Sequence, residues 1–401
     1  MQRHIMATPG EVLDDLDSFL DRISGGEEEE EEEYDDARLL VGEACHECRV
    51  DGSPAMAALQ AGHVGCLREI LRANEEERIA GVRSGNGATL AHVAARRGDV
   101  EVLGMLLAKT SSLARIGDVR GATPLHVCAY RGHEDCLEKL LEAGGDADQP
   151  DSDGATAIHF AAASGHLESV KTLVQKGGGN ANAKNSSGET PVYFAAQEGH
   201  LVCIQWLVET AGADPQLAST DGMTPLHAAA QTGRLNVTYW LVRYAHCPIS
   251  CRASDGATPV HFAAAKGHVD ILQWLLHHML ATGLERDDFG ATPVHDAAEQ
   301  GQLQCLHVFY SHNVDLNLTD NDGFIPKDLA EERGHTLCVQ FLSDPAKAYL
   351  EDRRLHNNEV AEGLGMLTFT GVTVDPRATK GKRKKVFSFL SKPKEGFVAV
   401  K

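Results

Sequence analysis

The chain has 401 residues, a net charge of −21 at pH 7 and an aromatic content of only 5%. A single compact domain of this length would be unusually large, and 39 glycines with so few aromatic residues are atypical of one large core. The negative charge disfavours a nucleic-acid-binding role, because phosphate binding needs a basic face. No apolar run reaches the roughly 18 residues that span a bilayer, and no secretory signal is evident, so we expect a cytoplasmic protein.

Residues 1–24 predict a short acidic amphipathic helix. Thr8 can cap it, Pro9 suits its first turn and Glu11 follows three residues after the cap. Its apolar face would hold Val12, Leu16, Phe19, Leu20 and Ile23. Residues 25–44 contain seven consecutive glutamates, 27–33, whose mutual repulsion predicts a disordered acidic linker.

The sequence Gly-x-Thr-Pro-apolar-His returns about every 34 residues from near residue 52 to near residue 335. Its clearest copies begin at Gly121, Gly222, Gly256 and Gly290, and variants begin at Gly87, Gly154, Gly188 and Gly323. A second glycine follows eleven residues after each of these. A fixed interval of this length indicates a stack of small units, so we expect nine repeats over residues 45–343, with atypical first and last units.

Each residue of the repeated sequence has a structural role. The first glycine, often after Asp or Asn, favours a hairpin turn, Thr caps a helix, and Pro fits the helix's first turn. The second glycine ends that helix, and a second helix carries the larger apolar residues. This pattern is that of ankyrin repeats. We therefore predict an all-α solenoid of helix-turn-helix units joined by β-hairpin fingers.

The stretch from Gly188 to Val242 resembles the ankyrin domain of espins more closely. The resemblance rests on Tyr193 in place of the repeat histidine, Gln197-Glu198-Gly199-His200, and Asp221-Gly222-Met223-Thr224-Pro225-Leu226-His227. It extends over residues 53–343. Membership of the espin family would imply a cytoskeleton-associated protein of actin-rich protrusions, whose ankyrin domain binds a class III myosin tail.

Equivalent positions in successive ankyrin repeats line one concave groove, and we expect a protein partner to bind there. Counting from the first glycine of each repeat gives a groove that is basic at its N-terminal end, mixed in the middle and acidic toward its C-terminal end. An extended or helical partner with apolar anchors and Lys or Arg residues would fit it. Alternatively, the charges only keep the surface soluble. The predicted partner-binding residues are Arg96, Tyr130, Phe160, Phe194, Gln197, Gln231, Phe262, Asp287, Asp288, Asp296, Glu299 and Glu332.

The ten cysteines and twenty histidines mostly follow the repeat. Five cysteines occupy one position four residues after the second glycine, where other repeats have Val or Ile, so they act as small core residues. Cys45 and Cys48 have zinc-like spacing, and Cys247 lies near Cys251, but neither pair completes a four-ligand set. We expect the repeat histidines to hydrogen-bond between adjacent repeats as neutral rings. No metal, cofactor or enzymatic activity is therefore predicted.

Trp206, Trp240 and Trp274 recur at intervals of 34 residues and should form a ladder. Packing between repeats is the favoured explanation, and an exposed partner-binding patch is the alternative.

Residues 344–401 predict a mostly disordered basic tail, in which Lys382, Arg383, Lys384 and Lys385 precede Phe387 and Phe389. Actin filaments, an anionic membrane or the chain's own acidic segments are candidate ligands, and a solvated tail without a partner is the alternative. We expect a monomeric scaffold that links a myosin tail to actin bundles, with at most auxiliary filament contact from this tail. The alternative is a general ankyrin adaptor for a signalling or degradation complex.

Overall fold

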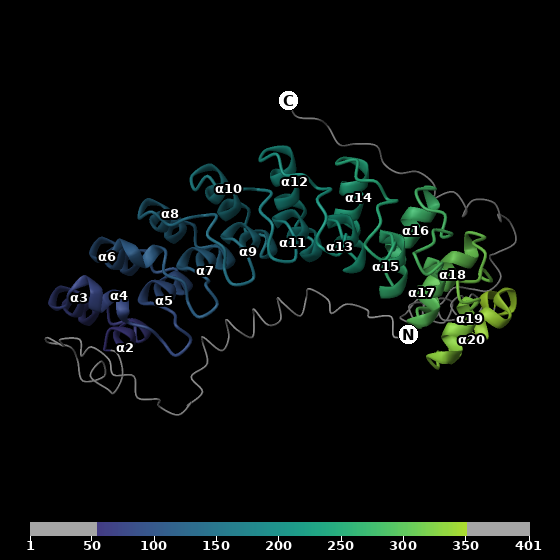
Figure 1. Cartoon of the computed structure of the whole chain (residues 1–401), viewed down its shortest axis with the longest axis horizontal. Coiled ribbons are helices and arrows are strands. Elements are labelled where there is room, and N and C mark those ends of the chain that lie inside the picture. Colours follow the sequence, from purple (N-terminus) through teal and green to yellow (C-terminus); the bar gives the residue numbers. More distant parts are fainter. Residues whose placement is uncertain (1–53, 351–401) are drawn as a thin grey trace, which may run out of the picture. The chain divides into compact units, whose positions relative to one another are not determined.

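The computed structural model describes residues 54–350, which form a row of paired helices (Figure 1). Within this range nine pairs follow one another along the chain, as the repeat predicts. The pairs are α2 (Pro54–Gln60) with α3 (Val64–Ala73), α5 (Leu90–Arg97) with α6 (Val100–Lys109), α7 (Pro124–Arg131) with α8 (Glu134–Glu142), α9 (Ala157–Ala163) with α10 (Leu167–Gln175), α11 (Pro191–Glu198) with α12 (Leu201–Glu209), α13 (Pro225–Gln231) with α14 (Leu235–Arg243), α15 (Pro259–Lys266) with α16 (Val269–His277), α17 (Pro293–Glu299) with α18 (Leu303–Ser311), and α19 (Pro326–Glu332) with α20 (Thr336–Ser343). Two short helices that the repeat did not predict complete the set: α4 (Glu76–Gly81) and the 3₁₀ helix η2 (Ser111–Ala114).

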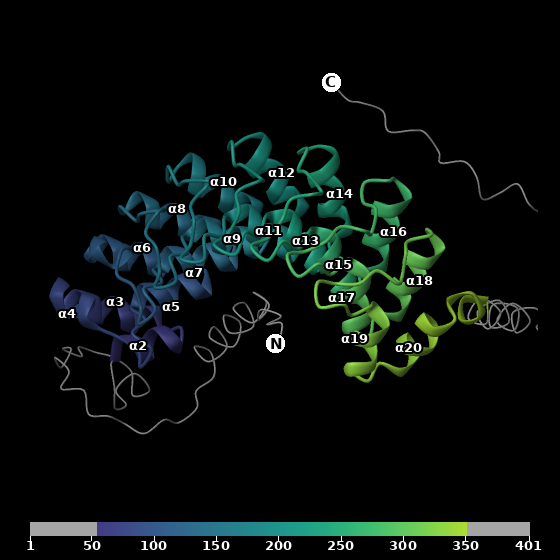
Figure 2. The same ribbon diagram turned by 45° about the vertical axis from the view of Figure 1, so that its right-hand side comes forward.

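The pairs pack into two layers. The first helix of each pair contacts the first helices of the neighbouring repeats, and the second helices contact one another in the same way. Figure 2 shows the first helices from α5 to α17 on the inner side of the curved row and the second helices from α6 to α18 on its outer side. We call these the inner layer and the outer layer.

The helix boundaries follow the predicted local signals. Thr123, with extended backbone angles, is the N-cap of α7, Pro124 occupies the first turn, and Gly132 ends the helix at φ 71°. The same sequence of Thr cap, Pro and positive-φ glycine recurs in α11 and α15. The positive φ explains glycine at the helix end, because other residues are strained in that conformation.

The helix-ending glycine has a second role that the sequence pattern did not indicate. The imidazole ring of the following repeat lies directly over it, so that a Cβ built at Gly165 would be 2.5 Å from Nδ1 of His200. Gly132 is similarly covered by His166, and Gly233 by His268. Glycine is therefore needed both for its backbone angle and for the close approach of the next repeat.

The fingers that join the repeats are tight turns. In one of them the Asp118 N–H donates to the Ala122 carbonyl at 2.9 Å, and the Gly121 N–H donates to the Asp118 carbonyl at 2.9 Å. Successive fingers are linked by a backbone hydrogen bond, such as that from the Ser152 N–H to the Arg120 carbonyl at 2.7 Å. Residues 54–350 contain no extended strand, and the isolated bridge between Arg83 and Thr89 is their one β-type pairing.

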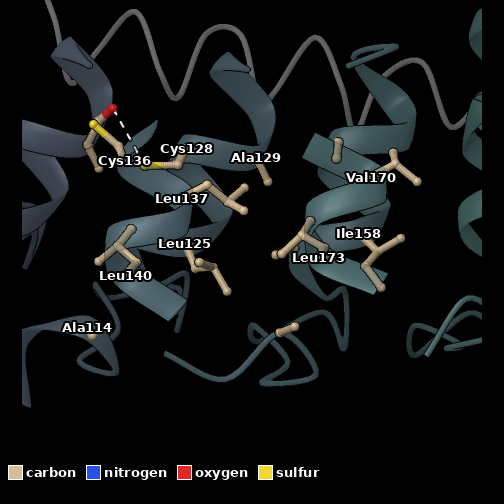
Figure 3. Close-up of a cluster of buried hydrophobic side chains, with 14 of the residues drawn as sticks. Ala114, Leu125, Cys128, Ala129, Cys136, Leu137, Leu140, Ile158, Val170 and Leu173 are labelled. Carbon is tan, nitrogen blue, oxygen red and sulfur yellow. Dashed lines mark hydrogen bonds between the residues drawn. The ribbon is translucent and has the colours of Figure 1, made fainter. Parts of the chain in front are cut away.

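The hydrophobic core runs between the two layers along the row. In the close-up of Figure 3, Leu137 and Leu140 of α8 lie near Leu125 of α7, and the next repeat contributes a similar group. Cys136, Cys203, Cys305 and Cys338 are buried in this core, and Cys66 is partly buried against it. These cysteines occupy the packing position that the sequence predicted.

By contact density the chain divides into two units, residues 1–343 and 344–401. Of the second unit, the structure describes residues 344–350, where the Ala348 N–H donates to the Asp344 carbonyl at 3.1 Å. The predicted N-terminal helix, the acidic linker, Cys45, Cys48 and the basic residues of the tail all lie outside the described range. Those interpretations remain predictions.

Candidate protein-binding surface

Buried histidines link each repeat to the next. In His126, Nδ1 accepts the backbone N–H of Thr123 at 3.0 Å, so the ring proton lies on Nε2, which donates to the Ala155 carbonyl of the next repeat at 3.2 Å. The same two contacts recur in five other repeats, at His92, His159, His227, His261 and His295. The predicted role of the repeat histidines is confirmed.

These histidines are held in the neutral state. Burial lowers the pKa of each ring to about 4, although its hydrogen bond to the carbonyl of the next repeat opposes the shift. The pKa falls because a charged ring loses its hydration in the core. This holds for His92, His126, His159, His227 and His261.

A second set of contacts fixes the C-terminal ends of the inner helices. Nε2 of His200 donates to the Ala163 carbonyl at 2.9 Å, and Nε2 of His268 donates to the Gln231 carbonyl at 2.7 Å. Where histidine is replaced by Arg234, the guanidinium Nε donates to the equivalent carbonyl, that of Gln197, at 2.9 Å. The inner helix ends, where the predicted partner-binding residues lie, are thus held in register from repeat to repeat.

Three phenylalanines of the predicted surface pack edge-on against the repeat histidines of the preceding unit. Phe160 lies 5.4 Å from His126 between ring centroids, Phe194 lies 5.7 Å from His159, and Phe262 makes the same contact. Phe160 and Phe262 are half-buried, whereas Phe194 is buried. The middle of the inner layer therefore presents rigid, partly exposed apolar rings.

The polar residues predicted for the middle and C-terminal parts of the groove are more enclosed than their pattern indicated. Gln197 is 2% exposed, Gln231 is 9% and Glu299 is 8%. Nη2 of Arg333 donates to the Glu299 carboxylate at 2.5 Å. The Gln197 amide oxygen is buried and makes no hydrogen bond. Their part in binding a partner stays a prediction.

The two predicted finger aspartates differ in their environment. The Asp287 carboxylate accepts the backbone N–H groups of Phe289 and Ala291, at 3.0 and 2.7 Å, and so holds the turn together. Asp288 is exposed and forms an ion pair with Arg252 at 3.3 Å. Asp288 is therefore the better placed of the two to meet another molecule.

The two ends of the inner layer carry opposite charge. At the N-terminal end, Arg96 and Tyr130 are half-buried at the ends of α5 and α7. At the C-terminal end, Asp296 on α17 is half-buried and Glu332 at the end of α19 is exposed. These four residues of the predicted groove all lie on helices of the inner layer.

Sequence comparisons agree with this architecture. The family description "Ankyrin repeats (3 copies)" matches residues 55–151, 125–219, 178–248 and 211–281, and "Ankyrin repeat" matches residues 289–321. Together these matches cover more than half of the chain. The protein belongs to the ankyrin-repeat family.

Its curated relatives share only part of this ankyrin array. Inversin of Gallus gallus is 36% identical over 94 residues, which is 23% of this chain and 8% of inversin. Ankyrin repeat and SOCS box protein 3 of Homo sapiens is 35% identical over 88 residues, which is 21% of this chain and 17% of that protein. Ankyrin repeat protein nuc-2 of Neurospora crassa is 31% identical over 124 residues, 31% of this chain and 11% of its own length. The chain thus spans less than a fifth of each relative, and the likeness concerns the repeats.

The outer layer of the ankyrin array bears an aromatic group that the sequence indicated only in part. Trp240 is buried, whereas Trp206 and Trp274 are half-buried. The ring centroids of Tyr239 and Trp274 are 5.4 Å apart, and Tyr244 lies 6.1 Å from Tyr239. The tryptophans therefore contribute both to packing and to the surface. The repeat pattern did not indicate the exposed tyrosines, because they do not recur between repeats.

Residues 54–350 contain no group of three or more His, Cys, Asp or Glu residues arranged to hold a metal ion. Cys251 lies 3.7 Å from Nδ1 of His227, but burial raises the pKa of the Cys251 thiol. A thiol with a raised pKa is a poor nucleophile, because the thiolate is the reactive form. None of the helices in this range has the length and apolar character to cross a bilayer.

Proposed function

We propose that the protein is a non-enzymatic adaptor that binds a segment of a partner protein along its inner layer. The observation that carries this proposal is the graded chemistry of that layer. Arginines lie at the ends of α5 and α7, half-buried phenylalanines lie on α9 and α15, and carboxylates lie on α17 and α19. A graded surface of this kind selects a partner by apolar contact in its middle and by charge at its ends.

The partner segment would be extended or helical, with apolar side chains that pack on Phe160 and Phe262. Complete burial of such a ring is worth about 1.5–3 kcal/mol, so the exposed remainder of each half-buried ring contributes about 1 kcal/mol. The rings already have fixed orientations against His126 and His227. Little conformational entropy is therefore lost when they are covered.

The test is selection of binders to the full chain from a library of displayed 20-residue peptides. For the selected peptides, Phe262→Ser should weaken binding about fivefold, which corresponds to the loss of about 1 kcal/mol. The matched control is Val202→Ser, which removes an apolar side chain that is 60% exposed on α12 of the outer layer. If Val202→Ser weakens binding and Phe262→Ser does not, the partner uses the other layer and the proposal is wrong.

At the acidic end, we propose that Lys or Arg residues of the partner meet Asp288 and Glu332. The variants Asp288→Ala and Glu332→Ala should weaken binding of a basic peptide and flatten its salt dependence, because fewer screened charges remain. Asp287→Ala is unsuitable for this purpose, since that carboxylate accepts two backbone N–H groups of its own turn. Unchanged affinity in both variants would remove the acidic end from the binding surface.

A finer proposal follows from the resemblance of residues 188–242 to espins. In this version the partner is a class III myosin tail, and the protein is cytoplasmic and associated with actin bundles. The basic residues Lys382–Lys385, with Phe387 and Phe389, would supply an auxiliary filament contact. The matches to inversin and to ankyrin repeat and SOCS box protein 3 favour the broader adaptor function.

Cosedimentation with filamentous actin separates the two versions. If the actin link is correct, the full chain pellets with filaments and a chain that ends at Ala346 does not. A full chain with Lys382–Lys385 changed to Gln gives the same comparison with the chain length kept. Absence of the full chain from the pellet would leave the adaptor function without a filament contact.

A further inference from the structure

Three arginines lie together at the N-terminal end of the inner layer. Arg96 and Arg97 end α5, and Arg131 ends α7, the helix packed beside it. Burial and the positive charges of Arg131 and Arg97 lower the pKa of Arg96, which indicates that the three side chains are near one another. We call Arg96, Arg97 and Arg131 the arginine cluster.

The cluster has no acidic counterpart in the described part of the chain. Arg131 and Arg97 are exposed, and Nη1 of Arg96 is buried without a hydrogen-bond partner. Arg97 donates only to main-chain oxygens, those of Leu59 and Gln60, at 2.7 and 2.9 Å. Five other arginines in residues 54–350 form ion pairs with carboxylates: Arg68, Arg72, Arg234, Arg252 and Arg333.

An uncompensated group of like charges disfavours the folded state unless an anion covers it. Guanidinium groups bind carboxylates through charge-assisted hydrogen bonds, which makes a segment rich in Asp or Glu the fitting ligand. The chain itself contains such a segment. Residues 27–36 carry seven glutamates and two aspartates around Tyr34.

We propose that the arginine cluster is a docking surface for an acidic segment and that its occupant is the chain's own residues 27–36. Two observations select this occupant. The hydrogen bonds from Arg97 to Leu59 and Gln60 place the cluster directly beside α2, the first described helix. Only 17 residues, 37–53, separate this segment from Pro54, where α2 begins.

This tether makes the contact favourable even if the individual ion pairs are weak. A linker of 17 residues can extend to about 60 Å, which is more than enough to reach a surface adjacent to its own anchor. Short flexible linkers give effective concentrations on the order of 1 mM, so an intrinsic Kd near 0.1 mM leaves the cluster about nine-tenths occupied. The docked segment would also cover Arg96, and would thereby compete with a partner at that end; this consequence alone rests on the proposed function.

The test uses the full chain and a fluorescein-labelled peptide of residues 25–37, read by fluorescence polarisation at low salt. A full-length variant with the seven glutamates at 27–33 changed to Gln should bind the peptide about tenfold more tightly than the wild type, because its own segment no longer competes. Adding Arg131→Glu to that variant should weaken binding at least tenfold. The Arg131 side chain makes no hydrogen bond within residues 54–350 and lies 5.7 Å from the centroid of the Tyr130 ring, so its substitution should leave folding intact, which the thermal unfolding midpoint checks.

The matched control is Arg243→Glu in the same background, an identical charge change at an exposed arginine on α14. It should alter peptide affinity less than twofold, and 0.5 M salt should remove the difference between wild type and the Gln variant. Equal affinity of wild type and the Gln variant would overturn the proposal. In that case, a loss of binding with Arg131→Glu would assign the cluster to an acidic segment of another protein. No step requires a partner, so failure here is distinguishable from failure of the adaptor function.

Discussion

Substitution of Gly165 by Ala tests whether the helix-ending glycine serves the neighbouring repeat as well as its own. Gly165 has φ +73°, and an added Cβ would lie 2.5 Å from Nδ1 of His200. Alanine at a left-handed position costs about 1 kcal/mol. The His200 ring would also have to move and weaken its 2.9 Å hydrogen bond to Ala163, which is worth about another 1 kcal/mol, with some packing lost in addition. We expect a loss of about 2–3 kcal/mol.

The matched control is Gly212→Ala, because Gly212 has φ +71° and an added Cβ there meets no atom within 4 Å. It should cost about 1 kcal/mol from backbone strain alone. Urea unfolding followed by far-UV circular dichroism measures both variants. In a His200→Ala background, Gly165→Ala should also fall to about 1 kcal/mol, since the obstructing ring is gone. Equal losses for the two glycines in the wild-type background would refute the close-approach argument.

Three further predictions concern acid, thiols and backbone strain. Five buried histidines have a pKa near 4 in the folded protein and about 6.5 in the unfolded chain, so the unfolded chain binds more protons between these values. The free energy of unfolding, which is at its full value above pH 6.5, should therefore fall toward pH 4 by about 1.4 kcal/mol per pH unit for each histidine. An unchanged urea midpoint at pH 5 would contradict this. Burial raises the pKa of Cys203 to about 11 and of Cys305 to about 12, so neither thiol should react with iodoacetamide at pH 8 until urea is added. Peptide mass measurement reads the modification, and modification of the native protein would show that these sites open. Met279 has φ +54° and is 91% exposed, so Met279→Asn should raise the free energy of unfolding by about 0.5 kcal/mol; a lower urea midpoint would show that the methionine is needed where it is.

The repeat boundaries could be predicted because their causes are local. A Thr cap, a proline in the first turn and a positive-φ glycine act within one helix, so α7, α11 and α15 begin and end where the sequence indicates. The helices α4 and η2 lie in spacers between repeats and lack that signal. Their internal cues are buried apolar residues, Ile79 in α4 and Leu113 with Ala114 in η2, which the repeat period does not reveal.

The predicted binding surface shows the limit of counting positions. Residues at one repeat position share a place on the inner helices, but their exposure depends on the side chains of the next repeat. Glu299 is enclosed because Arg333 reaches back to it from the following unit, whereas the equivalent Glu332 is exposed. The arginine cluster was likewise not recognised, because it joins neighbouring residues of one repeat with a residue of the next.

Photo-crosslinking of a selected peptide to the full chain tests the central claim most directly. A peptide that carries a benzophenone among its apolar residues should attach to the inner layer, at Phe160, Phe194 or Phe262, as located by mass spectrometry. Cross-links on the outer layer, at Val202, Tyr239 or Trp274, would contradict the assignment of partner binding to the inner helices.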